Sequence, residues 1–245
     1  MTNLIANWPA PKHIKALTTS RLSGHSQQGY ADNNLGLHVN DDPKHVHANR
    51  DALINQLQLP NEPIWLDQTH SNRCVVVENV GVDRQADAAV TRDAQFPLAI
   101  MTADCLPIVI CDNQGTEIAA IHAGWRGLAN GIIENTLASM RSAASSCLAW
   151  IGPAICAACY ETGEEVLQTF TDRYSFAHQA FYQDKSHLHA NLPQMAELIL
   201  YQLGISAIYQ SNACTFELHE QFYSYRRAAQ TGRMATLIWF QDNTL

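Results

Sequence analysis

The pattern of apolar and polar positions in the middle of the chain predicts a β-hairpin. Two apolar runs, residues 106–111 and 118–121, flank a segment that contains the turn-forming residues Asn113 and Gly115. Folding the chain back at this turn places Cys105 opposite His122, to within one residue. Cross-strand neighbours have Cβ atoms about 4.5–5.5 Å apart. A thiol and an imidazole are therefore expected to lie side by side.

Helical spacing of apolar residues predicts helices at residues 43–58, 128–140, 163–174 and 193–203. Asp42 and Pro43 are typical of the N-cap and first position of a helix. Asn191 and Gly204 are expected to begin and end the last one. Along the first helix, Arg50 lies on the apolar stripe, where an arginine either extends toward solvent or meets an anion.

Short apolar stretches predict strands at residues 14–18, 64–66, 74–78, 88–91, 148–151, 207–210 and 235–240. Residues 20–36 are rich in Gly, Ser and Asn, which indicates a long loop, either a functional lid or a variable surface segment. Strands and helices follow one another without an internal repeat or a long linker. We therefore expect one α/β domain over residues 1–245.

Composition narrows the functional class. The chain has 245 residues, 47% of them apolar, and a formal net charge of -8 without a basic run. This balance argues against nucleic-acid binding, and no apolar stretch reaches the roughly 18–20 residues of a membrane span. The N-terminus has no basic segment followed by an apolar one, and the seven cysteines are odd in number and irregularly spaced. A cytoplasmic protein with reduced thiols is expected.

Three residues at predicted strand ends or turns suggest chemistry: His70, Cys105 and His122. Two imidazoles and a thiolate suit zinc, and three protein ligands leave a fourth position for water or substrate. Their sequence separations match no metal-binding motif. Two alternatives stay open: Cys105 as a nucleophile with His122 as its base, or a buried thiol beside a hydrogen-bonded core histidine.

Other candidates have weaker support from the sequence. Arg126, in the first turn of a helix, either binds phosphate with the free N–H groups there or is a surface arginine. A Cys-x-x-Cys pair at 156 and 159 is either redox-active or a coincidence, because no second pair completes a zinc knuckle. Of the two His-x-His pairs, the one at 45 and 47 lies on a predicted helix, where its side chains do not share a face, and is expected to be solvated. The pair at 187 and 189 is left without an assigned role.

Several motifs in order resemble the YfiH family, also called the laccase-domain, polyphenol oxidoreductase or peptidoglycan editing factor family. They are NLGLHV at 34–39, Asn49-Arg50, QTH at 68–70, TADCLP at 102–107, HAGWRG at 122–127, IGPAI at 151–155 with Tyr160-Glu161, FYSYRR at 222–227 and TGR at 231–233. The resemblance covers nearly the whole chain. It implies a layered α/β sandwich with mixed sheets, distantly similar to the cysteine hydrolase domain of cytotoxic necrotizing factors.

The resemblance also assigns the metal ligands to His70, Cys105 and His122, with zinc, or else copper, as the metal. The activities attached to the family are phosphorolysis of purine nucleosides (adenosine, inosine, methylthioadenosine), deamination of adenosine, copper-dependent oxidation of phenols, and removal of wrongly incorporated serine from peptidoglycan precursors. Multicopper oxidases need His-Cys-His and many His-x-His motifs. Since this chain has no His-Cys-His, the laccase activity has little support.

We expect a zinc-dependent purine nucleoside phosphorylase with adenosine deaminase activity, acting on a nucleoside and phosphate as a monomer or weak homodimer. Zinc would activate a water or substrate oxygen, with Cys105 among its ligands. Asp104 is the expected general acid and base, and Arg50, supported by Arg227 or Arg126, would hold phosphate. The alternatives are an amidase that edits peptidoglycan precursors, a copper-dependent polyphenol oxidase, and a binding module with a structural zinc.

Overall fold

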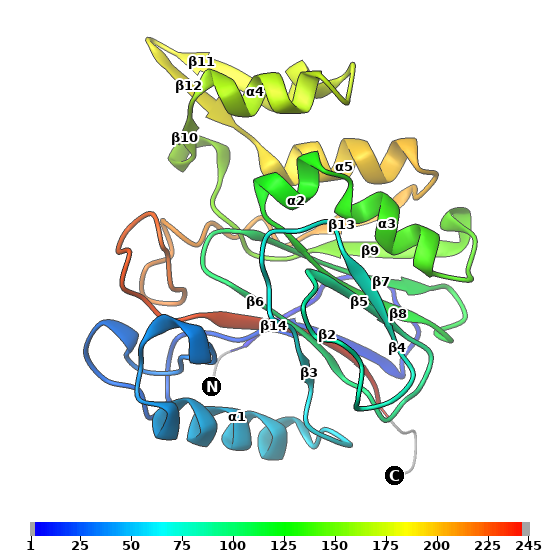
Figure 1. Ribbon diagram of the computed structural model, residues 1–245, viewed down its shortest axis with the longest axis vertical. Coiled ribbons are helices and arrows are strands. Elements are labelled where there is room, and N and C mark those ends of the chain that lie inside the picture. The colour runs from blue at the N-terminus through cyan, green and yellow to red at the C-terminus, as the bar shows by residue number, and fades with distance from the viewer. Residues whose placement is uncertain (1–2, 242–245) are drawn as a thin grey trace.

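Two stacked β-sheets form the centre of the protein, with helices on both outer faces (Figure 1). The computed structural model describes residues 3–241. The five-stranded sheet has the order β1-β2-β14-β6-β3. Its strands are β1 (Leu4–Ile5), β2 (Ile14–Thr18), β14 (Met234–Phe240), β6 (Leu98–Thr102) and β3 (Ile64–Trp65).

The six-stranded sheet has the order β13-β9-β7-β8-β5-β4, and a small third sheet has the order β10-β12-β11. The strands of the six-stranded sheet are β13 (Ala207–Gln210), β9 (Cys147–Ile151), β7 (Leu106–Asp112), β8 (Ile118–Ala123), β5 (Ala88–Thr91) and β4 (Cys74–Val77). Those of the small sheet are β10 (Glu161–Thr162), β12 (His187–Ala190) and β11 (Phe181–Asp184). Both large sheets contain parallel and antiparallel pairs, so the expected layered sandwich with mixed sheets is confirmed.

Helix α1 covers the outer face of the five-stranded sheet, and α2, α3 and α5 cover that of the six-stranded sheet (Figure 1). The small sheet and α4 lie beyond them at one end of the molecule. The helices are α1 (Pro43–Leu57), α2 (Trp125–Ala129), α3 (Ile132–Ser139), α4 (Glu164–Thr171) and α5 (Leu192–Gln202). Within the described chain, no helix combines the length and apolar character needed to cross a bilayer.

The strands at the centre are apolar on both faces because both faces are covered. In β7, Ile108 and Ile110 pack toward the helices, whereas Val109 and Cys111 pack between the two sheets. The same two-sided burial applies to β6, where every residue is buried. Continuous apolar runs are therefore required here, in place of the alternation of a half-exposed strand.

The predicted central hairpin is present, but its register differs from the expected one by two residues. Pro107 lies opposite His122, and Leu106 lies opposite Ala123. Asp112 still belongs to β7, and its side-chain carboxylate accepts hydrogen bonds from the backbone N–H groups of Thr116 and Glu117. The turn is therefore centred closer to β8 than expected. Cys105 therefore lies just before β7 and is not a cross-strand partner of His122.

The predicted helix over residues 128–140 is wrong in its extent, because the structure contains two helices there. Helix α2 begins at Trp125, and α3 begins after Gly131, whose φ of +88° is left-handed. Glycine adopts this conformation at little cost, whereas a continuing helix cannot contain it. The start of α1 is as predicted: the Asp42 side chain accepts a hydrogen bond from the Lys44 N–H, and Pro43 is its first residue.

The segment 20–36 is a loop, as predicted, with one 3-10 turn at Gln28–Tyr30. Its last part is packed inside the molecule, since Asn34 and Leu35 are fully buried. Asn49 of α1 donates a hydrogen bond to the carbonyl of Asn34, and Arg50 donates two to the carbonyl of Leu35. This part of the loop is therefore fixed to α1.

Candidate active site

A cavity of about 460 Å³ lies where the two large sheets meet, which is within the roughly 300–1,000 Å³ of small-molecule sites. We call it the central cavity. It is lined by His38, Gln68, His70, Met101, Thr102, Ala103, Asp104, Cys105, His122, Ile155, Tyr160, Tyr225, Arg226 and Arg233. These residues come from segments that are far apart in the sequence.

Chain crossings between the sheets bring two of the predicted ligands into the cavity. His70 lies on the connection from β3 to β4, and Cys105 lies on the short connection from β6 to β7. His122 lies on β8, near its end. The ligand atoms of the three side chains all lie within 4.8 Å of one another, and Cys105 Sγ is 3.9 Å from His70 Nε2. The structure therefore brings together the three residues that the sequence singled out.

Asp87 fixes this group from behind. Its buried carboxylate lies 2.8 Å from His122 Nδ1 and accepts hydrogen bonds from the backbone N–H groups of His70 and Ser71. Occupying Nδ1 leaves Nε2 of His122 for a ligand, the usual arrangement around metal-binding histidines. This role of Asp87 was not predicted from the sequence. A polar residue directly before the buried strand β5 was the available signal.

The donor set fits a metal ion. A thiol and two imidazoles are ligands that zinc and copper accept, and the His70 and His122 rings lie edge to face with centroids 4.8 Å apart. Gly124 lets the backbone pass close to the group: a Cβ there would lie 3.0 Å from His70 Cδ2 and 3.2 Å from Cys105 Sγ. A larger residue at 124 would therefore require the His70 and Cys105 side chains to shift by a few tenths of an ångström.

Without a metal, the mutual interactions of Cys105, His122 and Asp87 favour the charged form of each side chain. Burial raises the pKa of Cys105, but hydrogen bonds and positive charge from His122 and His70 outweigh it and lower the pKa to about 6. Burial lowers the pKa of His122, but Asp87 and Cys105 raise it overall. Burial raises the pKa of Asp87, yet hydrogen bonds from His122 and Ser71 lower it to about 2. A thiolate ready to bind a cation results.

Asp104 borders the cavity beside Cys105 and is held by three donors. Its carboxylate accepts hydrogen bonds from the Thr215 hydroxyl (2.7 Å), the Ser224 hydroxyl (3.0 Å) and the Arg226 backbone N–H (2.7 Å). Its own backbone is left-handed, with φ of +89°. A non-glycine residue in this conformation costs free energy that the surrounding contacts must supply, and such residues are common at functional sites.

The arginine predicted to bind an anion from α1 lies elsewhere. Arg50 does not line the central cavity. Its guanidinium donates to the Leu35 carbonyl and stacks 4.0 Å from the centroid of the Trp65 ring. Burial lowers the pKa of Arg50 to about 10. Neither alternative from the sequence applies, because this arginine is buried on a carbonyl and an aromatic ring.

Two other arginines face the cavity. Arg226 and Arg233 line it, whereas Arg126 and Arg227 do not. Arg227 donates to the carbonyls of Thr215, Phe216 and Phe222, and Arg126 lies over the ring of its neighbour Trp125. Arg226 stacks on Tyr160 and donates to the Glu161 carbonyl. The sequence motif contained both adjacent arginines, but nothing in it showed which one faces the cavity.

Comparison with known proteins places the chain. A family model described as multi-copper polyphenol oxidoreductase laccase matches residues 15–241. The chain belongs to this family. A purine nucleoside phosphorylase of Haemophilus influenzae is 42% identical over 238 residues, covering 96% of this chain and 98% of its own. An Escherichia coli protein named purine nucleoside phosphorylase YfiH is 38% identical over 237 residues, with the same coverage of both chains.

The fold is shared with solved structures. A crystal structure of a Neisseria meningitidis protein superimposes with a TM-score of 0.94 at 42% identity and covers 99% of this chain and 100% of that one. The resemblance to the YfiH family and its layered α/β architecture are thereby confirmed.

In this polyphenol oxidoreductase laccase family member, the His-x-His pairs lie outside the central cavity. His45 and His47 belong to α1. His187 pairs with Glu161, and His189 lies 3.0 Å from the Ala157 carbonyl. Neither pair adds imidazoles to the Cys105 group, so the family's description is not matched by a second set of histidines there.

Proposed function

We propose that this chain is a zinc-dependent purine nucleoside phosphorylase that accepts adenosine, inosine and methylthioadenosine and also deaminates adenosine. The observation that carries the proposal is one cavity that combines the His70, Cys105 and His122 donors with two arginines. The names of the relatives that are about 40% identical over nearly the whole chain support the same class of reaction. Zinc, when bound, supplies Lewis acidity at this end of the cavity.

The side chains suit the parts of a nucleoside and a phosphate. Tyr160, Tyr225 and Ile155 give the cavity aromatic and apolar surface for a flat purine. Arg226 and Arg233 supply positive charge for phosphate, a role for which guanidinium groups have suitable geometry. We therefore propose these two arginines, in place of Arg50, Arg126 and Arg227, for phosphate binding.

In the reaction, an oxygen of phosphate forms a bond to the anomeric carbon of the ribose, and the bond from that carbon to the purine nitrogen breaks. The electron pair leaves with the purine, which takes up a proton. We propose Asp104 as the group that moves this proton, because it lines the cavity beside Cys105 and its carboxylate is held in place by three donors. The backbone N–H of Arg226, one of the two proposed phosphate-binding arginines, donates a hydrogen bond to the Asp104 carboxylate.

The test is phosphate-dependent release of hypoxanthine from inosine, followed by chromatography, with metal content measured on the same sample. Wild type is compared with Cys105→Ala. We expect release only with phosphate, and loss of both zinc at this site and turnover in the variant. Zinc-loaded wild type that leaves inosine untouched would refute the phosphorylase proposal. Conversion of adenosine to inosine, in separate samples without phosphate, tests the deaminase activity.

A further inference from the structure

A second group of metal-ligating side chains lies beside the central cavity and is not part of it. Its members are Cys156, Cys159, Cys214 and Glu217, and we call it the cysteine cluster. One ligand atom from each lies within 4.8 Å of all the others. Among the described residues, the His70 group is the other cluster of this kind.

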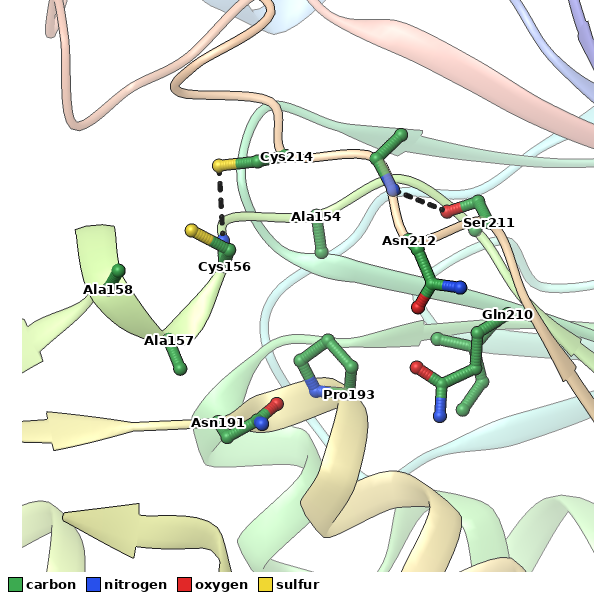
Figure 2. A pocket seen from close by; sticks show the side chains of 13 residues that line it. Ala154, Cys156, Ala157, Ala158, Asn191, Pro193, Gln210, Ser211, Asn212 and Cys214 are labelled. Atoms are coloured by element: carbon green, nitrogen blue, oxygen red, sulfur yellow. Dashed lines mark hydrogen bonds between the residues drawn. The ribbon is translucent and has the colours of Figure 1, made fainter.

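Local structure places the three thiols together. Cys156 is the N-cap of the short 3-10 helix Ala157–Cys159, and Cys159 is its last residue. Cys214 is held nearby by an isolated parallel β-bridge to Ala154. Figure 2 shows the Cys214 sulfur directed at Cys156, whose backbone N–H donates a hydrogen bond to it over 3.3 Å. A backbone N–H donated to a cysteine sulfur is the kind of outer contact that supports metal ligands.

We propose that the cysteine cluster binds one zinc ion as a closed, tetrahedral structural site with three thiolates and the Glu217 carboxylate as ligands. Sulfur atoms about 2.3 Å from a tetrahedral zinc lie roughly 3.8 Å apart. The Cys159 Sγ and Glu217 Oε1 atoms are 3.7 Å apart, and all pairs lie within 4.8 Å. Shifts of about an ångström or less complete the site. Four protein ligands leave no open position, unlike the three of the central cavity.

The surroundings suit a charged site better than a patch of buried apolar cysteines. Cys156 and Cys159 are only half-buried, and Glu217 is exposed. Four anionic ligands exceed the charge of one zinc ion. Arg227 donates to the carbonyls of Thr215 and Phe216, the two residues after Cys214, so its positive charge lies beside the excess.

The cluster joins a segment that lines the central cavity to a segment that holds Asp104. Ile155 and Tyr160, on either side of the 3-10 turn, line the cavity. The residue after Cys214 is Thr215, whose hydroxyl holds Asp104. A zinc ion in the cluster therefore fixes the position of the lining segment and of the carboxylate that the other segment holds.

Metal content measured by mass spectrometry on purified protein tests the proposal. The double variant His70→Ala/Cys105→Ala removes two ligands of the central cavity, so metal that remains reports on the cluster. We expect two zinc ions per chain in wild type, one in this double variant, and one in Cys159→Ser. Cys74→Ala removes a half-buried cysteine outside both groups and is the matched control, with two zinc ions expected. Circular dichroism checks that each variant is folded.

Cobalt substitution identifies the ligands in the double variant. Three thiolates predict an intense thiolate-to-cobalt charge-transfer band and the visible bands of tetrahedral cobalt, both lost when Cys159→Ser is added. Absence of bound metal in the double variant, with the cluster thiols found free or joined as a disulfide, would overturn the proposal. Metal and spectra are measured without substrate, so the result is independent of the reaction proposed above.

Two further measurements test the fourth ligand and the structural role. Glu217→Gln is expected to weaken zinc affinity at the cluster about tenfold or more, as loss of a charged ligand should; unchanged affinity would remove Glu217 from the site. Hydrogen exchange at residues 154–160 and 213–217 is expected to slow about tenfold on zinc binding in the double variant. Unchanged exchange would rule out the role in fixing the cavity wall.

Discussion

Two aspartates at the centre of the molecule differ in what their carboxylates can reach. Asp87 is fully buried behind His122, whereas Asp104 borders the central cavity. Both accept several hydrogen bonds. Asp87 therefore positions His122 and the backbone of His70, and Asp104 is the carboxylate that we propose for proton transfer.

Replacing Asp104 with Asn tests proton transfer with little effect on the fold. The Asn oxygen can still accept from the Arg226 N–H, and its amide can donate to the Thr215 hydroxyl, which rotates. We expect kcat to fall about 10²–10⁴-fold, with zinc content unchanged. Thr215→Val, which removes one hydrogen bond and keeps the charge, is the control and should cost much less. Turnover of Asp104→Asn near the wild-type rate would exclude Asp104 from proton transfer.

The lowered pKa of Cys105 predicts unusual reactivity in protein stripped of metal by a chelator. The thiolate is the reactive form, so alkylation accelerates as pH rises through the thiol's pKa. With this pKa at about 6, the rate should level off near neutral pH instead of rising toward pH 9. Peptide mass spectrometry after iodoacetamide treatment measures it. Asp87→Asn should move the midpoint of the alkylation rate against pH upward, because the variant no longer stabilises the positive charge on His122. A wild-type midpoint above about 8, the range of free cysteine, would contradict the prediction.

At the scale of elements, α1 is an anchor for the loop that precedes it. Asn49 and Arg50 on its buried face hold the carbonyls of Asn34 and Leu35. Periodicity identified this face correctly, and Asp42 with Pro43 identified the start of the helix. It could not show that the buried guanidinium meets a carbonyl and the Trp65 ring, because these partners are distant in the chain.

Arg50→Met separates this anchoring role from phosphate binding. The variant leaves the buried Leu35 carbonyl without its two donors, at a cost of about 1–3 kcal/mol, and loses the stacking on Trp65. We expect the free energy of unfolding in urea to fall by about 2–3 kcal/mol and the KM for phosphate to stay within about twofold. Lys44→Met, on the exposed face of α1, should change neither. A large rise in KM with unchanged stability would restore the anion-binding role.

At the scale of the whole molecule, the two large sheets share one apolar layer. Trp150 of β9 is fully buried in it, with its indole N–H directed at Asn7. Since His70 and Cys105 lie on crossings between these sheets, we expect the cavity to assemble when the sheets dock.

Trp150→Ala is expected to reduce the free energy of unfolding by about 3–5 kcal/mol, the usual cost of truncating a buried aromatic residue. It should also weaken zinc binding at the central cavity, which is measured by competition with a chromophoric chelator. Tyr201→Ala, at a side chain that is 66% exposed, is the matched control and should change neither quantity. Unaltered zinc affinity in a destabilised Trp150→Ala would show that the site forms independently of sheet docking.

The sequence predicted local features well and long-range ones poorly. Turn formers and apolar runs located the central hairpin, yet not its register, since Asp112 extends β7 through contacts to Glu117 that periodicity does not encode. Gly131 could have ended the helix prediction earlier, because a glycine inside a helical pattern lowers its stability. The hairpin of β11 and β12 was missed, since β11 shows no alternation and β12 alternates over only four residues.

In the candidate site, the three proposed ligand residues were singled out from the sequence, but the residues that support them were not. Asp87 and Arg233 enter the site through folding of distant segments. Asp87 is marked in the sequence only as a polar residue before a buried strand, and Arg233 only as part of the TGR motif, so neither could be assigned a partner. The adjacent residues Arg226 and Arg227 point in different directions. The Arg226 backbone N–H donates to the Asp104 carboxylate, whereas the Arg227 guanidinium donates to the Phe222 carbonyl.

The positions of His70, Cys105 and His122 on separate segments have a consequence for protein abundance. An ion that binds them only when both sheets are assembled adds its binding free energy to that of the folded state. Loss of the ion would then raise the fraction of open chains that proteases attack. For such a protein, the supply of a trace metal would govern turnover of the polypeptide as well as turnover of substrate.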